Sequence, residues 1–349
     1  MNKEIIRISD TFELSKSKLY INDVIDSNWI SNTGKYISLC EEQLRKELNV
    51  KHVLLTNNGT SATHCIMKSV KYKYPQCKKI YIPDHCYVAV YNSVLYEYEK
   101  DQIVIIPIDK DTWNIDLIYV EQMEYGSCLL IVHNLGNIIP IQKIKEKRPD
   151  IIIVEDNCEG FMGKYHKYYS GTKSFASSIS FYANKHITSG EGGAFITNDD
   201  DTYQYIKRFC MQGMTERRYI HDIIAYNYKY NNLSAALLYS QLQQIHLIVN
   251  KKKELFNRYK ELFEPYTDII SLQKIEQNTE HSYWIFGIKI KKGFSDYKII
   301  NQYYLENGIE IRPFFYNYKS HNHLNHIHTF ENYKSMNNTI ILLPLHCYL

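Results

Sequence analysis

Short runs of apolar residues, many of them β-branched, recur between about residue 50 and residue 200. The runs lie at 52–56, 79–82, 103–108, 128–133, 151–156, 178–182 and 193–197. Most of them are apolar at successive positions, which is typical of strands buried on both faces, and helix-like stretches separate them. The pattern therefore predicts an α/β domain in which helices cover a largely parallel sheet.

The first of these strands leads into a predicted helix through a Gly-Thr-Ser triplet at 59–61. Ala62, Ile66 and Val70 follow at four-residue spacing, which places them on one face of that helix. Hydroxyl side chains are favoured at a helix N-terminus. A strand, a tight turn and a helix N-terminus in this order form a natural site for a phosphate group.

Residues 233–262 predict one long helix or two, because apolar residues are followed by basic ones without any Pro or Gly. Two further strands are predicted beyond it, at 283–290 and 309–316. We therefore expect a large α/β domain over residues 1–240, with a helical segment at its start, and a small α+β domain over residues 241–349.

Composition and charge narrow the classes of partner. The 349 residues carry 41 Lys and Arg against 38 Asp and Glu, and the net charge of +3 gives no reason to expect nucleic acid or an anionic membrane as partner. The N-terminal residues mix both signs of charge, and the apolar runs elsewhere are only as long as strands. The eight cysteines include no C-x-x-C pair and are expected to be reduced thiols. We expect a cytoplasmic protein that acts on a small molecule.

Candidate chemistry concentrates in residues 154–199. A buried strand there ends in Glu155 and Asp156, and ligands of open α/β sheets bind at the carboxyl ends of strands. Lys185 follows a later strand and precedes a glycine-rich turn at 189–193. Pyridoxal 5′-phosphate (PLP) needs a lysine for its Schiff base, a carboxylate that keeps its pyridine nitrogen protonated, and a helix N-terminus for its phosphate. The sequence supplies a candidate for each.

The same stretch resembles the DegT/DnrJ/EryC1/StrS family of sugar aminotransferases, whose pattern there is E-D-x-x-x-G, then F-S-F-x-x-x-K-x-I-T-T-G-E-G-G, then T-N-D. Shorter matches occur in the family's order at 28–37, 57–64, 82–89, 108–116, 133–136, 226–236 and 307–315. The resemblance covers almost the whole chain. It implies the aspartate aminotransferase (type I) PLP fold, which has a large, mostly parallel sheet domain and a small C-terminal α+β domain.

The resemblance implies roles for individual residues. Lys185 matches the lysine that carries PLP and shuttles protons, Asp156 matches the partner of the pyridine nitrogen, and Tyr87 matches the ring stacked on the cofactor. Glu159 occupies a cofactor-binding position where many relatives have Gln or His. The residues matched to the phosphate site are Gly59, Thr60, Ser61, Ser180 and Asn227. In the family this asparagine comes from the neighbouring subunit, so a homodimer with shared active sites is expected.

The implied reaction moves the amino group of L-glutamate, by way of PLP and its pyridoxamine form (PMP), to C4 of a nucleotide-linked 4-keto-6-deoxyhexose. The nucleotide is UDP, dTDP or GDP, and the product is a 4-amino-4,6-dideoxy sugar of the viosamine or perosamine type for glycan biosynthesis. A viosamine-type product on UDP or dTDP is favoured by resemblance. The candidate substrate contacts are Thr33, Lys229, Arg312, Tyr316 and His321.

The chain departs from the family pattern in three places. Residues 173–177 read KSFAS where G-S-F-G-D is usual, Lys229 replaces an arginine, and the helix expected after residues 343–346 is not found. None of these changes affects Lys185 or Asp156. The third leaves the exact shape of the small domain open.

Three alternative functions are weighed against C4 transamination. The first is amination at C3. The second is dehydration at C3, for which relatives replace the lysine with histidine; His186 is adjacent, but the matched I-T-S-G-E-G-G run places Lys185 at the reactive position. The third is a non-catalytic protein with the PLP fold, which is expected to lose an anchor residue, whereas Lys185 and Asp156 are both present.

Four histidines lie close together, at 321, 323, 326 and 328. His323 and His326 have a helical spacing that a metal could use, but no cysteine or carboxylate lies at ligand spacing within the run. We predict no metal site. Contact with the nucleotide or sugar and a plain surface loop both remain open for this segment.

Overall fold

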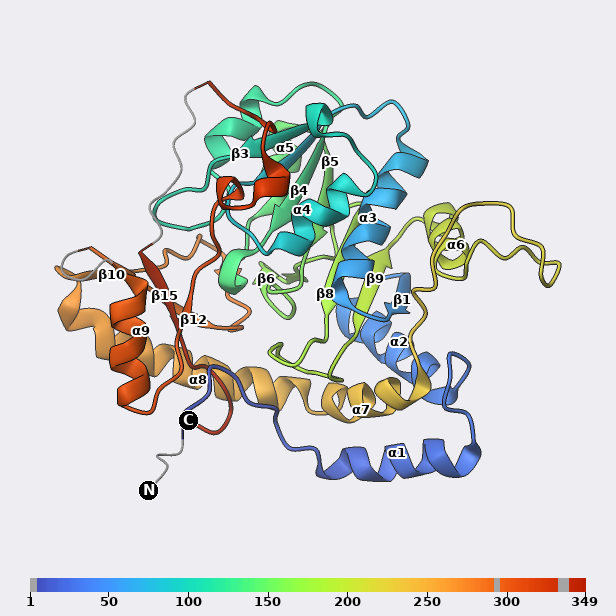
Figure 1. Ribbon diagram of the computed structural model, residues 1–349, viewed down its shortest axis with the longest axis horizontal. Coiled ribbons are helices and arrows are strands. Elements are labelled where there is room, and N and C mark those ends of the chain that lie inside the picture. Colours follow the sequence, from blue (N-terminus) through green and yellow to red (C-terminus); the bar gives the residue numbers. More distant parts are fainter. Residues whose placement is uncertain (1–4, 292–295, 332–338) are drawn as a thin grey trace.

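One eight-stranded sheet forms the centre of the fold (Figure 1), and its strands are, in chain order, β1 (His52–Thr56), β2 (Ile80–Pro83), β3 (Ile103–Ile106), β4 (Cys128–Val132), β5 (Ile152–Asp156), β8 (Ala176–Ser180), β9 (Gly193–Thr197) and β14 (His328–Thr329). The computed structural model describes residues 5–291, 296–331 and 339–349. The spatial order is β1-β9-β8-β5-β4-β2-β3-β14. Neighbouring strands from β8 to β14 are parallel, and β9 lies antiparallel between β1 and β8. The prediction of a largely parallel sheet is confirmed.

Nine helices surround or extend from this sheet within the described ranges: α1 (Ser15–Ser27), α2 (Lys35–Leu48), α3 (Gly59–Lys73), α4 (Val88–Leu95), α5 (Ile141–Lys147), α6 (Asp200–Phe209), α7 (Asn232–Leu242), α8 (Ile245–Phe263) and α9 (Tyr297–Glu306). Helices α3, α4 and α6 share one core cluster with the sheet. Residues of α5 contribute to a cluster on its other face, and α1, α2 and α7 to a third cluster around β1 and β9. Both faces of the sheet are therefore covered.

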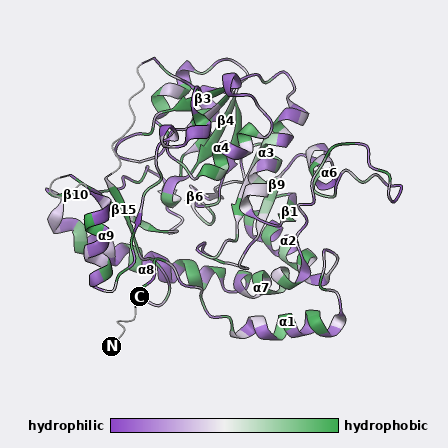
Figure 2. Ribbon diagram, in the orientation of Figure 1, coloured by the Kyte–Doolittle hydropathy of each residue, from purple (hydrophilic) through white to green (hydrophobic). Residues whose placement is uncertain are grey.

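Strand β3 shows why the apolar runs are continuous. Ile103 and Ile105 belong to the core cluster under α3 and α4, while Val104 and Ile106 belong to the cluster that contains α5. Successive side chains of a strand point to opposite faces, so a sheet covered on both faces needs apolar residues at every position. Figure 2 shows this concentration of hydrophobic residues on the central strands.

The long helical stretch at 233–262 forms two helices, α7 and α8, which are separated at residues 243–244. Helix α8 leads to a four-stranded antiparallel sheet of order β10-β12-β15-β13, whose strands are β10 (Ile270–Leu272), β12 (Phe286–Ile290), β13 (Arg312–Pro313) and β15 (Ile340–Leu343). Phe256 of α8 packs with Phe286 and Leu343 in the core of this unit. The predicted smaller α+β unit is therefore present.

The sequence-based boundaries differ from the structure in several places; β8, for example, spans Ala176–Ser180 where 178–182 was predicted. The strand predicted at 309–316 is reduced to the two residues of β13. The chain also returns to the large sheet after leaving it, because β14 pairs in parallel with β3. A third, small sheet has the order β11-β6-β7, with β6 (Lys164–Tyr165), β7 (Tyr168–Tyr169) and β11 (Thr279–Glu280). In the part of the chain that the structure describes, no helix is both long and apolar enough to cross a membrane.

Candidate active site

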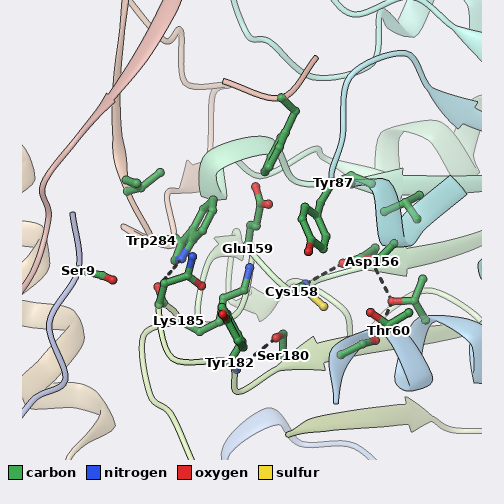
Figure 3. A pocket seen from close by; sticks show the side chains of 18 of the residues that line it. Ser9, Thr60, Tyr87, Asp156, Cys158, Glu159, Ser180, Tyr182, Lys185 and Trp284 are labelled. Atoms are coloured by element: carbon green, nitrogen blue, oxygen red, sulfur yellow. Dashed lines mark hydrogen bonds between the residues drawn. The ribbon is translucent and has the colours of Figure 1, made fainter. Parts of the chain in front are cut away.

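A cavity of about 630 Å³ opens at the carboxyl ends of β5 and β8 (Figure 3). The large sheet and its helices supply most of the lining, including Thr60, Asp156 and Lys185. The four-stranded unit adds Trp284 and Arg312 from the opposite side. This position agrees with the rule that ligands of open α/β sheets bind at the carboxyl ends of the strands.

Asp156 is the last residue of β5, and its carboxylate lines the cavity. Thr63 Oγ1 on α3 donates to Asp156 Oδ2 at 3.0 Å, and the backbone N–H of Cys158 donates to Oδ1 at 3.1 Å. The side chain is only 6% exposed. These two donors hold the buried Asp156 carboxylate in an orientation that faces the cavity.

Glu155, its neighbour in β5, points to the other face of the sheet. Its Oε2 lies 2.8 Å from His133 Nε2 and accepts the N–H of Gly171 at 3.0 Å. Burial alone would raise the pKa of Glu155, but the hydrogen bond and charge of His133 bring it below its ordinary value. Strand alternation therefore separates the two acids into one that faces the cavity and one that belongs to the core.

The start of α3 forms a second wall of the cavity. The side chain of Asn58 caps the helix by accepting the N–H of Ser61 at 2.8 Å. The amides of residues 59 and 60, at the start of the helix, have no intrahelical acceptor. A Cβ at Gly59 would stand 2.7 Å from the Cβ of Ser180, so only glycine allows the strand end and helix start to approach this closely. The result is a small cradle of amides and hydroxyls suited to a phosphate.

Lys185 lies in the segment between β8 and β9. Gly193 begins β9, and a Cβ on it would lie 2.4 Å from the backbone oxygen of Asn58, so glycine there lets β9 begin close to the start of α3. The Nζ of Lys185 lies 4.2 Å from the ring centroid of Trp284. Figure 3 shows the Lys185 side chain among Glu159, Tyr87 and Trp284, with Asp156 further along the same cavity.

Glu159 is buried beside Lys185. Its Oε2 accepts the N–H of Leu135 at 2.8 Å, and the side chain is 3% exposed. Burial raises the pKa of Glu159 to about 7, although the Lys185 charge and the Leu135 N–H act in the opposite direction. The carboxyl group therefore changes its charge close to neutral pH.

Some of the remaining candidate residues line the cavity, and the others lie outside its lining. Tyr87, Gly59, Thr60 and Ser180 line the cavity, as does Arg312 among the five candidate substrate contacts. The candidates outside the lining are Ser61, Thr33, Lys229, Tyr316, His321 and Asn227. Asn227 is exposed on the segment between α6 and α7. Within the described ranges, no group of three His, Cys, Asp or Glu side chains could hold a metal ion.

The lining residues that sequence reasoning missed include Thr63, Ser9 and Trp284. Thr63 lies almost one helical turn after Thr60, so helical spacing could have placed it on the cavity face. Ser9 and Trp284 come from segments outside the central sheet. No local sequence pattern predicts that these two segments lie over the carboxyl ends of β5 and β8.

A fixed lysine, a buried aspartate and a helix N-terminus meet in one cavity whose dimensions suit a small aromatic phosphate ester, and they match the three groups that PLP requires. The fold and the cavity thus define a PLP-dependent enzyme of the aspartate aminotransferase fold. The chain belongs to the DegT/DnrJ/EryC1/StrS aminotransferase family, whose sequence model matches residues 13–349. It is a PLP-dependent sugar aminotransferase.

Known proteins resemble this chain in sequence or in fold. GDP-perosamine synthase of Escherichia coli O157:H7 is 30% identical over 306 residues, which cover 86% of this chain and 82% of the relative. The E. coli GDP-4-keto-6-deoxy-D-mannose-3-dehydratase with bound hydrated PLP has a TM-score of 0.89, is 22% identical, and covers 99% of this chain and 96% of its own. Helicobacter pylori PseC, an aminotransferase involved in the biosynthesis of pseudoaminic acid, has a TM-score of 0.88 at 23% identity, with 99% and 95% covered.

The raised pKa of Glu159 predicts a pH-dependent cost to stability. Below the ordinary glutamate value of 4.5 the acid is protonated in both the folded and unfolded states; between 4.5 and about 7 only the folded state keeps the proton, so folding loses stability as the pH rises. Glu159→Gln should therefore stabilise the cofactor-free protein relative to the wild type by an amount that grows across this range to about 3 kcal/mol.

Denaturant unfolding of both proteins at a series of pH values measures this difference. Glu146→Gln, at an exposed position, is the matched control. A wild-type-to-variant difference that is the same at both ends of the pH range would show that Glu159 does not titrate between them.

Proposed function

We propose that this enzyme transfers the amino group of L-glutamate to C4 of a nucleotide-linked 4-keto-6-deoxyhexose, which yields a 4-amino-4,6-dideoxy sugar. The observation that carries the proposal is the convergence of Lys185, Asp156 and the start of α3 on one cavity in a chain of this family. The 30% identity to a GDP-perosamine synthase favours GDP among the three nucleotides, in place of the UDP or dTDP expected from the motifs alone.

When bound, PLP supplies an electron sink that stabilises negative charge on the carbon from which a proton is lost. Lys185 is the residue that would hold it covalently. Asp156 would keep the ring nitrogen protonated, and Thr63 and the Cys158 amide keep Asp156 in place for that purpose. The helix start at 59–60, together with Ser180, would bind the phosphate.

Lys185 also acts on protons. Released by the amino donor, its Nζ would act as the base that takes the proton from the α-carbon of glutamate and would thereby become the ammonium. In the second half of the reaction it delivers a proton to C4 of the sugar.

The position of His186 argues against dehydration. Its Nε2 lies 2.6 Å from the backbone oxygen of Ser282, to which it donates, and His186 does not line the cavity. Burial lowers the pKa of His186 well below its ordinary value, with smaller contributions from Lys252 and Lys185, so its ring is neutral. The close structural match to a 3-dehydratase reflects the fold and leaves the choice of reaction to these side chains.

A homodimer is supported by the segment between α6 and α7, which projects away from the sheet in Figure 1. It exposes several large apolar side chains, among them Tyr219 (74% exposed) and Ile224 (93% exposed). Apolar groups exposed together mark a surface for another protein. Asn227 lies on the same segment and outside the cavity of its own chain, as expected for a residue that completes the active site of a second copy.

Replacing Lys185 tests the reaction. Lys185→Ala should lose the visible absorbance of lysine-bound PLP and lower turnover by at least roughly 10²–10⁴-fold, because it removes the proton-transfer group together with the covalent anchor. The assay uses L-glutamate and a panel of GDP-, UDP- and dTDP-4-keto-6-deoxyhexoses, with the products identified by mass and NMR.

Lys167→Ala changes an exposed lysine outside the cavity and is the control. A 3-deoxy product without incorporated nitrogen would reject transamination. Full turnover by Lys185→Ala would reject the role given to Lys185.

Mixing two impaired variants tests whether the active sites are shared. Lys185→Ala and Asn227→Ala homodimers should each be impaired. In a mixed dimer, however, one site would combine the intact Lys185 of one subunit with the intact Asn227 of the other, so an equal mixture should recover about a quarter of the wild-type activity.

Subunits are exchanged by mild unfolding and refolding, and the activity of the mixture is compared with that of each variant treated alone. If Asn227 acted within its own chain, no mixed dimer would contain an intact site. Absence of recovery in a mixture shown to contain mixed dimers would therefore rule out sharing.

A further inference from the structure

The short segment at 281–285 leads into β12 of the four-stranded unit and forms part of the cavity wall. Ser282 is bound to the large domain at three points: its N–H donates to the oxygen of Gly136 at 2.8 Å, its Oγ donates to the oxygen of Glu159 at 2.5 Å, and its own oxygen accepts from His186 Nε2 at 2.6 Å. Two of these partners are Glu159 itself and the chain neighbour of Lys185. The segment therefore has a fixed position relative to the site.

The backbone of this segment reverses at Tyr283, which has a φ of 61° although it is not glycine. Its N–H donates to Nδ1 of His281 at 2.8 Å, and its ring packs edge-on against Phe256 of α8. A bulky residue adopts this conformation only where surrounding contacts impose it. The reversal directs the next side chain, Trp284, into the cavity.

Trp284 meets Lys185 in a defined orientation. Its indole Nε1 donates to the backbone oxygen of Asn184 at 2.9 Å, its side chain is 6% exposed, and the Lys185 Nζ lies 4.2 Å from its ring centroid (Figure 3). Among the residues that the structure describes, none forms an ion pair with the Lys185 ammonium. The ring face is thus its close partner.

We propose that Trp284 is a positioning residue whose ring face holds the Lys185 ammonium whenever the lysine is not joined to the cofactor. The inference rests on the proposed role of Lys185. An aromatic face attracts a cation and does not attract a neutral amine in the same way. This attraction is weaker than that of a buried ion pair, so the nitrogen keeps its place at a smaller cost to the loss of its proton.

Other ionisable groups also surround Lys185. They come from the end of β5, the turn after it, the segment that carries Lys185, the residue before α4, α8 and β13, and comprise Asp156, Cys158, Glu159, Tyr182, His186, Glu191, Tyr87, Lys252 and Arg312. Trp284→Leu and Trp284→Phe both leave these residues in place, so the comparison of the two variants reports the ring face.

The test measures how fast the cofactor-free enzyme binds PLP covalently as a function of pH, followed by visible absorbance. Only the neutral amine reacts, so a ring face that stabilises the ammonium moves the pH midpoint of this rate upward, and the titration of free PLP is common to all variants. Trp284→Leu removes the ring and should move the midpoint down by about one pH unit, which makes the reaction up to about tenfold faster at low pH. Trp284→Phe keeps a weaker ring face and should give a smaller downward shift.

The variants separate the possible outcomes. An unchanged or raised midpoint in Trp284→Leu overturns the inference, and so does a shift in Trp284→Phe as large as that in Trp284→Leu, since the indole hydrogen bond to Asn184 would then be the cause. Trp284→Met serves in place of the leucine variant if that protein does not fold. Lys185→Ala is measured in parallel. If this variant gains the absorbance as the wild type does, the proposed function fails. If it does not react and the midpoint of Trp284→Leu is unchanged, only the role of Trp284 is rejected.

Discussion

The hydrogen bond between Thr63 and Asp156 fixes the distance on which the site depends. Thr63 lies in the first turns of α3, and Asp156 ends β5, so their 3.0 Å contact ties the phosphate cradle to the acid that faces the cavity. A ligand of fixed length with an anionic end and a basic ring nitrogen requires this spacing to be constant. The same hydroxyl lies 3.0 Å from Ser178 Oγ on β8, which joins the strand leading to Lys185 to the same frame. Helix α3 and strands β5 and β8 are therefore joined at the side chain of Thr63.

Much of this frame could be predicted from the sequence, because it is built from local patterns. Continuous apolar runs gave β1 and β9 with their observed bounds, and the Gly-Thr-Ser triplet marked the start of α3. Lys185 and Asp156 were expected at one edge of the sheet, and both line the cavity. Other features were not predictable. Strand β14 has two residues and no periodicity, and its pairing with β3 depends on contacts more than 200 positions apart in the chain. Trp284 reaches Lys185 only through an unusual φ at Tyr283 and hydrogen bonds to distant segments.

The electrostatics of the site follow from burial as much as from charge. Burial raises the pKa of Glu159 to about 7 and lowers the pKa of Lys252, on α8, to about 8. Both groups lie near Lys185, and both change charge within a narrow interval around neutral pH. The ring face of Trp284, 4.2 Å from the Nζ of Lys185, is a partner that does not titrate. An ion pair would hold the ammonium more tightly, and it would oppose the loss of its proton, on which the proposed reaction depends, more strongly than a ring face does.

The large sheet and the four-stranded unit contribute different groups to the cavity. The large sheet and its connections supply Lys185, Asp156 and the start of α3, whereas the four-stranded unit supplies Trp284 and Arg312 on the opposite wall. The segment near residue 8 completes that wall: Ile6 pairs with Ile309, and the N–H of Ile8 donates to Glu310 Oε2 at 3.0 Å. If the proposed sugar binds against the wall that faces the cofactor, changes in these outer segments alter the substrate while the frame around Asp156 stays the same. An aminotransferase and a dehydratase have TM-scores of 0.88 and 0.89 to this chain, so the fold alone does not determine the reaction.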